Sequence, residues 1–233
     1  MTYLYRALLW WQRSLMSCSL VCLAGCVLAL YYTDLSWMLL PGIIVGVLYE
    51  HLVEWATHGW LQHQPSRLFR YFVQRHARHH RQVTRYQSLE NNAVLLPVIA
   101  LLLMPAWAAL AFYPVYQAIA AGVIIGFQAA HIYLNALHYD LHAPSPILPG
   151  WLRHTAYYRT LASVHWQHHY GTRPDSFLAD YRIYSVSNPW LDAALDKMGA
   201  ARAMDIAFGW VNRLTSSRAR LLWWPPRGSR SPH

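Results

Sequence analysis

Four long apolar segments limit the folds that this chain of 233 residues can adopt. An α-helix needs about 20 apolar residues to cross the hydrocarbon core of a bilayer, and each segment has close to that length. Apolar residues make up 55% of the chain and charged residues only 12%, which is too apolar a composition for an ordinary soluble domain. The sequence therefore predicts one all-α, membrane-embedded domain over residues 1–233, with transmembrane helices at about 15–32, 35–55, 93–113 and 115–136.

The connections between these segments predict two helical hairpins. Thr33-Asp34 joins the first pair and the region of Pro114 joins the second pair, so each pair returns to the side that it left. Neither tip carries Lys or Arg, whereas the connection at 56–92 is rich in arginine. By the positive-inside rule, we expect both termini and this connection on the cytoplasmic side. The arginines of the connection are Arg67, Arg70, Arg75, Arg78, Arg81 and Arg85.

The net charge of +9 fits either nucleic acid or anionic lipid headgroups as a partner. Because the chain is so apolar, we expect lipid and no nucleic acid. The aromatic and basic tail at 217–233 is typical of an interfacial or flexible segment. Together these features predict a multi-pass protein of a bacterial inner membrane, with histidine-rich cytoplasmic regions at 56–92 and 137–190.

Ten of the fourteen histidines fall into four compact groups. Imidazole is a common ligand of zinc, copper and iron, and ten such ligands are too many for one ion. The isolated His154 and His233 are interpreted as interfacial hydrogen-bonding residues. The groups are His58 and His63 (HxxxxH), His76, His79 and His80 (HxxHH), His138 and His142 (HxxxH), and His165, His168 and His169 (HxxHH).

The spacing within each group predicts where the rings lie. Residues three and four apart share a helix face, so each HxxHH is expected to aim three imidazoles at one point, and HxxxH two. An interval of five does not share a face of an α-helix. We therefore expect His58 and His63 to straddle a helix end near Gly59 or Pro65.

The first group follows the second apolar segment, the second group precedes the third segment, and the last two groups follow the fourth segment. This topology places all four groups on the same cytoplasmic face. Polar residues extend this region into the membrane, where such residues usually serve function. We predict that they support the metal ligands through hydrogen bonds. These supporting residues are His51, Glu54, His131, Asn135 and Asp140.

The order HxxxxH, HxxHH, HxxxH, HxxHH, from His58 to about Pro189, resembles the fatty acid hydroxylase and sterol desaturase superfamily. The resemblance implies that the ten grouped histidines coordinate two iron ions, which oxidise a lipid, sterol or carotenoid with O2. Zinc is the alternative occupant after purification, because its intrinsic affinity exceeds that of ferrous iron. No cysteine cluster for a fused ferredoxin is present, so a separate ferredoxin- or cytochrome-type electron donor is expected.

Several alternatives stay open at this point. The proline-rich interval from His142 to His169 and the closing segment Asn188–Asp192 depart from the superfamily pattern, which leaves the substrate undetermined. Hydroxylation is the first expectation and desaturation the second, since both begin with hydrogen abstraction. A zinc-dependent membrane lipid hydrolase would need only three histidines. A metal transporter would place its ionisable groups at the membrane midplane. The sequence does not indicate an oligomeric state.

Overall fold

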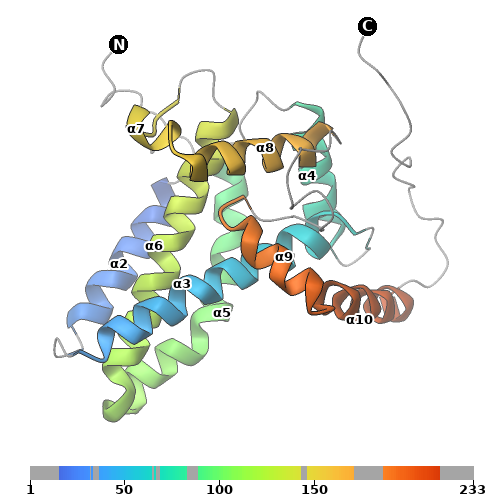
Figure 1. Cartoon of the computed structure of the whole chain (residues 1–233). Coiled ribbons are helices and arrows are strands. Elements are labelled where there is room, and N and C mark those ends of the chain that lie inside the picture. Colours follow the sequence, from blue (N-terminus) through green and yellow to red (C-terminus); the bar gives the residue numbers. More distant parts are fainter. Residues whose placement is uncertain are drawn as a thin grey trace, which may run out of the picture. The chain divides into compact units, whose positions relative to one another are not determined.

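The structure, a computed structural model, describes residues 16–31, 33, 37–64, 66, 69–82, 89–142, 146–170 and 186–215. All regular elements in these ranges are helices, as the sequence predicts (Figure 1). They are α2 (Met16–Tyr31), α3 (Leu39–Ala56), the π-helix η2 (Thr57–Gln62), α4 (Arg70–Arg81), α5 (Leu89–Phe112), the 3₁₀ turn η3 (Pro114–Tyr116), α6 (Gln117–His142), α7 (Gly150–Arg153), α8 (Ala156–Tyr170), α9 (Pro189–Lys197) and α10 (Ala200–Thr215).

Two continuous helices in the described part of the chain are long and apolar enough to cross a membrane. They run from Leu39 to Gln62 and from Pro114 to His142, and a shorter apolar helix spans Ile99–Phe112. The last expected segment ends at 136, whereas α6 continues to His142 because no helix-breaking residue occurs before Pro144. Four membrane spans, and the side on which each end lies, stay predictions.

The chain divides into two compact units, each built from two stretches of sequence. Unit 1 comprises Met1–Val53 and Thr84–Leu152, and unit 2 comprises Glu54–Val83 and Arg153–His233. The single domain expected over 1–233 stays a prediction. The tail at 217–233 lies outside the described residues.

Unit 1 has an apolar core formed by α2, α5 and α6. One cluster contains small residues that let these helices approach closely, and a second contains larger side chains packed against Tyr49 and Trp107. The first cluster consists of Ala29, Leu110, Ala120, Ala121 and Ile124, and the second of Ile99, Leu103 and Phe127.

Glycines bring the backbones of α3 and α6 into contact. A Cβ added at Gly46 would collide with the backbone oxygen of Val123, and one added at Gly126 with the backbone oxygen of Ile43. Gly42 and Gly122 face each other in the same way, so both helices carry a GxxxG pair at this seam. Contacts advance in the same direction along both helices, which are therefore parallel. Such close packing of small residues is a principal source of helix association in lipid.

Unit 2 joins η2 to the two C-terminal helices through tryptophans. Trp55 and Trp60 are buried together with Ala201 of α10, and the indole nitrogen of Trp60 donates to Asp205 Oδ1 at 3.0 Å. The Asn188 side chain caps α9 by accepting from the backbone nitrogen of Leu191. Gly199, with a φ of 79°, makes the turn from α9 into α10, a conformation that glycine adopts readily.

Candidate metal centre

The π-helical turn η2 explains the HxxxxH spacing. In a π-helix the backbone bonds run from residue i to i+5, so an interval of five brings two side chains onto one face. His58 lies inside this turn and His63 caps it, and their rings stack with centroids 5.2 Å apart. The expectation that these two histidines lie on different faces was wrong, because it assumed α-helical geometry. The expectation that they straddle a helix end near Pro65 is confirmed, since η2 ends at Gln62.

Helix α4 directs the histidines of its HxxHH motif in two directions. His76 and His80 are one turn apart, and their Nε2 atoms approach to 2.8 Å. His79 belongs instead to a group with His165 and His169. The expectation that three imidazoles of one HxxHH meet at a point was therefore wrong, since positions i+3 and i+4 differ by about 100° around a helix.

Helix α8 shows the same division. His165 and His169 are one turn apart, with ring centroids separated by 4.6 Å, and join His79. His168 joins His58, His63 and His76. Each HxxHH motif thus contributes to both groups, and the two groups are adjacent within unit 2.

The ligand atoms of His58, His63, His76 and His168 lie within 4.8 Å of one another. His76 Nε2 is 3.1 Å from His58 Nε2 and 2.8 Å from His63 Nε2. The Nε2 atoms of His63 and His168 are 3.0 Å apart. Two nitrogens that each bind one ion at about 2.1 Å lie about 3.0 to 3.4 Å apart, so these separations are close to those of ligands sharing an ion.

Hydrogen bonding alone cannot account for this arrangement. The Nε2 atom of a neutral imidazole carries either one hydrogen or one lone pair, so it pairs with one partner. His76 Nε2 nevertheless has three Nε2 neighbours within 3.1 Å, from His58, His63 and His80. A cation at their centre would accept a lone pair from each ring. The donor set therefore fits a metal ion.

Burial keeps the rings in the form that a metal requires. It lowers the pKa of His76 and His168 well below the ordinary histidine value, and the neighbouring histidines lower both pKa values further. Both rings are consequently neutral at pH 7, with a lone pair available for coordination.

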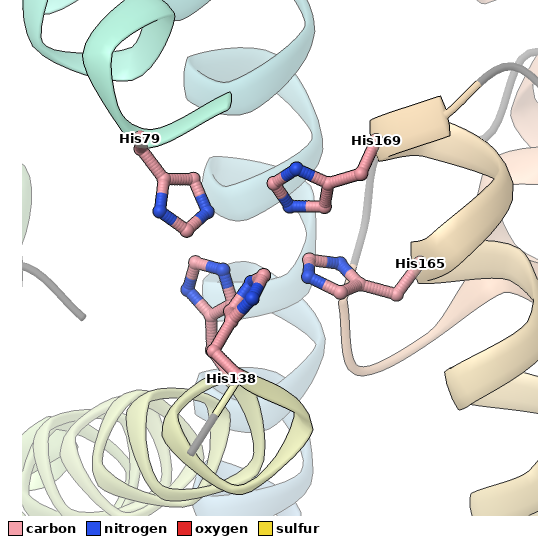
Figure 2. Close-up of side chains that lie close together, drawn as sticks. His79, His138, His165 and His169 are labelled. Carbon is pink, nitrogen blue, oxygen red and sulfur yellow. The ribbon is translucent and has the colours of Figure 1, made fainter. Parts of the chain in front are cut away.

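The second group within unit 2 consists of His79, His165 and His169. Figure 2 shows their three rings turned toward a common space. Their ligand atoms also lie within 4.8 Å of one another. His80 connects this group to the first. Its Nε2 atom is 2.8 Å from His76 Nε2, and its ring centroid is 4.3 Å from that of His169. Unit 2 therefore brings together eight of the ten histidines singled out from the sequence.

His138 and His142 belong to unit 1 and lie one turn apart near the end of α6. Their ring centroids are 4.8 Å apart, so the HxxxH motif places two imidazoles side by side as expected. His142 is buried and His138 partly buried.

Glu54 has a clear partner in unit 2. Its carboxyl group accepts a hydrogen bond from the backbone nitrogen of Val186 and another, at 2.6 Å, from Ser187 Oγ. The Tyr157 hydroxyl of α8 donates to the backbone oxygen of Ser187 at 3.0 Å. This clasp, made by Glu54, Val186, Ser187 and Tyr157, connects the helix turn before His58 to the helix that carries His165, His168 and His169.

The predicted supporting residues of unit 1 bind groups of their own unit. Glu50 Oε1 is 3.1 Å from His131 Nδ1, and Glu50 Oε2 is 3.8 Å from His51 Nδ1. The Asn135 amide donates to the backbone oxygen of His131 at 2.7 Å. Asp140 accepts from the backbone nitrogen of Leu148 at 2.8 Å. Support of metal ligands by these residues and by Glu54 stays a prediction.

The residues predicted from the sequence do not include Glu50, Tyr157 or Ser187. Glu50 is an acid in an apolar run and is 1% exposed, a position that by itself marks a residue with a buried partner. Tyr157 and Ser187 carry no comparable signal in the sequence. Of the isolated histidines, His154 is exposed, and His233 lies outside the described residues.

Comparisons of the chain with protein-family models, with curated proteins and with solved structures give no match. The likeness to the hydroxylase and desaturase superfamily rests on the order and spacing of the histidine groups.

Proposed function

We propose that this chain is a membrane-embedded oxygenase that holds two iron ions with histidine and uses O2 to hydroxylate a lipid-like substrate. The observation that carries the proposal is the convergence of Nε2 atoms around His76. A second, adjacent group around His79 supports two ions rather than one. The resemblance adds His138 and His142 to the ligands, and desaturation is the alternative outcome on the same site.

Metal ions held there would activate O2, the oxidant, for attack on an unactivated C–H bond, which no side-chain acid or base can attack. The residues of the chain provide neutral imidazole ligands, and burial keeps bulk water from His76 and His79. The Glu54 clasp fixes the start of η2 relative to α8. Histidines from both elements therefore meet in one orientation, which is the preorganisation that a metal site needs.

A separate electron donor has an accessible approach to this site. Arg78 and Arg81 are exposed on α4, the same helix that buries His76 and His79. An exposed basic surface directly behind the ligands favours an acidic donor of ferredoxin or cytochrome type, because opposite charges accelerate encounter. Electrons delivered there would cross only the width of one helix.

The membrane setting belongs to the same proposal. Two long apolar helices support it, and four spans with a cytoplasmic site would keep the acyl or polyprenoid chain in lipid. Electrons would then arrive from the cytoplasm. A bacterial inner membrane provides this arrangement.

The test combines metal analysis with product analysis. Protein purified in detergent should contain two iron ions per chain, or zinc exchangeable for iron. Membranes that contain the iron-loaded protein, an electron donor and O2 should accumulate a lipid heavier by one oxygen atom. A loss of two hydrogens would identify desaturation instead.

A matched pair of variants separates the site from the rest of the chain. His168→Ala should abolish product formation per inserted protein, whereas His154→Ala, at an exposed position on no metal group, should retain it. Lipid cleavage that needs zinc and no O2 would identify a hydrolase and overturn the proposal. Full activity with a single ion per chain would overturn the two-ion site.

A further inference from the structure

Helix α10 is apolar on two faces. Its inner face, with Ala201, Met204 and Phe208, packs around Trp55 and Trp60. Its outer face exposes Ile206, Trp210 and Leu214, of which Leu214 is 81% exposed. These three residues are four apart, so they form one stripe along the helix. Packing of the inner face prevents α10 from turning this stripe inward.

The charges of α10 are distributed as a membrane surface would require. Arg202 and Arg213 are exposed at one edge of the stripe, and the Arg213 guanidinium lies over the Trp210 ring at 4.8 Å. Asp205, the acidic residue of α10, is only partly exposed, and its carboxyl group accepts from Trp60. Arg213 is followed by no acidic residue in the sequence, and Arg202 and Arg213 give this edge of α10 a positive charge. Negative charge is therefore the complement of this edge.

Within unit 2, α10 packs against the end of a long apolar helix. The inner face contacts Trp55 and Trp60, where the apolar helix Leu39–Gln62 approaches its end. If that helix crosses the bilayer, its end lies at the boundary between acyl chains and headgroups. Tryptophan and arginine side chains are favoured at this boundary.

We infer that α10 lies in the plane of the membrane interface, with Ile206, Trp210 and Leu214 among the acyl chains and Arg202 and Arg213 toward anionic headgroups. Arg213 stacked on Trp210 keeps its charge at the surface while the indole enters the boundary. The inference rests on the membrane setting of the proposed function and adds a second, lateral attachment to it.

The experiment places a fluorescent label on single cysteines in the full chain, after replacement of Cys18, Cys22 and Cys26 by alanine. Ile206→Cys and Leu214→Cys report on the stripe. Lys197→Cys, exposed at the end of α9, is the matched control. Each labelled protein is reconstituted as one copy per nanodisc of phosphatidylcholine and phosphatidylglycerol, with and without nitroxide-labelled lipid.

Labels at 206 and 214 should lose most of their fluorescence to nitroxide lipid and be protected from aqueous iodide, and the label at 197 should behave oppositely. Replacing phosphatidylglycerol by phosphatidylcholine should weaken quenching at 206 and 214. Iodide quenching at these two positions, or protection from both quenchers, would overturn the inference. The measurement is repeated with two copies per disc. Protection that occurs only with two copies would identify a second chain as the occupant and overturn the inference.

Failure of this inference is distinguishable from failure of the proposed function. Protein that remains in membranes, binds iron and forms product while α10 is exposed to water contradicts only the interfacial helix. Protein that leaves membranes in alkaline carbonate contradicts the membrane setting on which both depend.

Discussion

The histidine groups of unit 2 and the Glu50–His131 pair of unit 1 are both buried polar clusters, but their members face different neighbours. In unit 1 Glu50 Oε1 faces His131 Nδ1 at 3.1 Å, so that an acceptor faces a possible donor. In unit 2 imidazole nitrogens face other imidazole nitrogens at 2.8 to 3.1 Å. An acceptor–donor pair of this kind can hold a helix seam together, whereas converging imidazole nitrogens suit a metal ion.

Replacement of His76 by alanine should have the largest effect, because His76 lies at the centre of the first group. Its loss removes the nitrogen that approaches His58, His63 and His80. Even a residue that only supports a ligand can change metal affinity by about 10-fold to 100-fold, so His76→Ala should weaken iron binding by at least about 100-fold. Iron titration of the purified variant measures this change.

The matched control for His76→Ala is His131→Ala, which removes an equally buried histidine from unit 1. If the comparison is correct, His131→Ala keeps its iron content while losing stability, and this result would contradict the predicted support of the metal ligands by His131. Equal iron loss in both variants would show that the two clusters do not differ in the way described.

A paired substitution sharpens the interpretation of Glu50 and His131. His131→Leu leaves the Glu50 carboxyl group buried without its imidazole partner, which should destabilise the protein by about 3 kcal/mol. Adding Glu50→Leu should restore most of this stability, because replacing both partners by apolar groups is often neutral. Thermal unfolding in detergent at constant lipid content provides the measurement. Failure of the double variant to recover would assign the pair a role beyond the helix seam.

Features that depend on local sequence could be predicted, whereas features that depend on contacts between distant segments could not. Apolar length and histidine spacing are local properties, so the all-helical class and the pairing of His138 with His142 could be predicted. The π-helical turn at Thr57–Gln62 could not, because no local residue preference distinguishes it from an α-helix. His79 and His76 belong to different groups because of where α8 packs, which local sequence does not specify. Likewise, the partner of Glu54 lies more than a hundred residues away in sequence.

The glycine seam that holds Glu50 beside His131 should be nearly as sensitive to substitution as the Glu50–His131 pair itself. Gly126→Ala places a methyl group against the Ile43 backbone, which cannot move without separating α3 from α6. Overpacking of this kind costs about 1–3 kcal/mol, and we expect about 2 kcal/mol here. The control is Gly209→Ala in α10, where an added Cβ meets nothing within 4 Å and alanine should stabilise the helix slightly. Similar melting temperatures for both variants would contradict the seam.

The smallest effect is expected at the clasp, where Glu54→Gln keeps the shape of the side chain but changes its hydrogen-bonding groups. The carboxyl group accepts from both Val186 and Ser187, whereas an amide offers only one oxygen for these two donors. One weakened hydrogen bond costs about 1 kcal/mol, so unfolding should occur at a slightly lower temperature. In the proposed site Glu54 acts on the histidines through the clasp, so iron content should persist while iron dissociates several-fold faster. Ser187→Ala should reproduce this behaviour, and complete loss of iron from either variant would instead place Glu54 among the metal ligands.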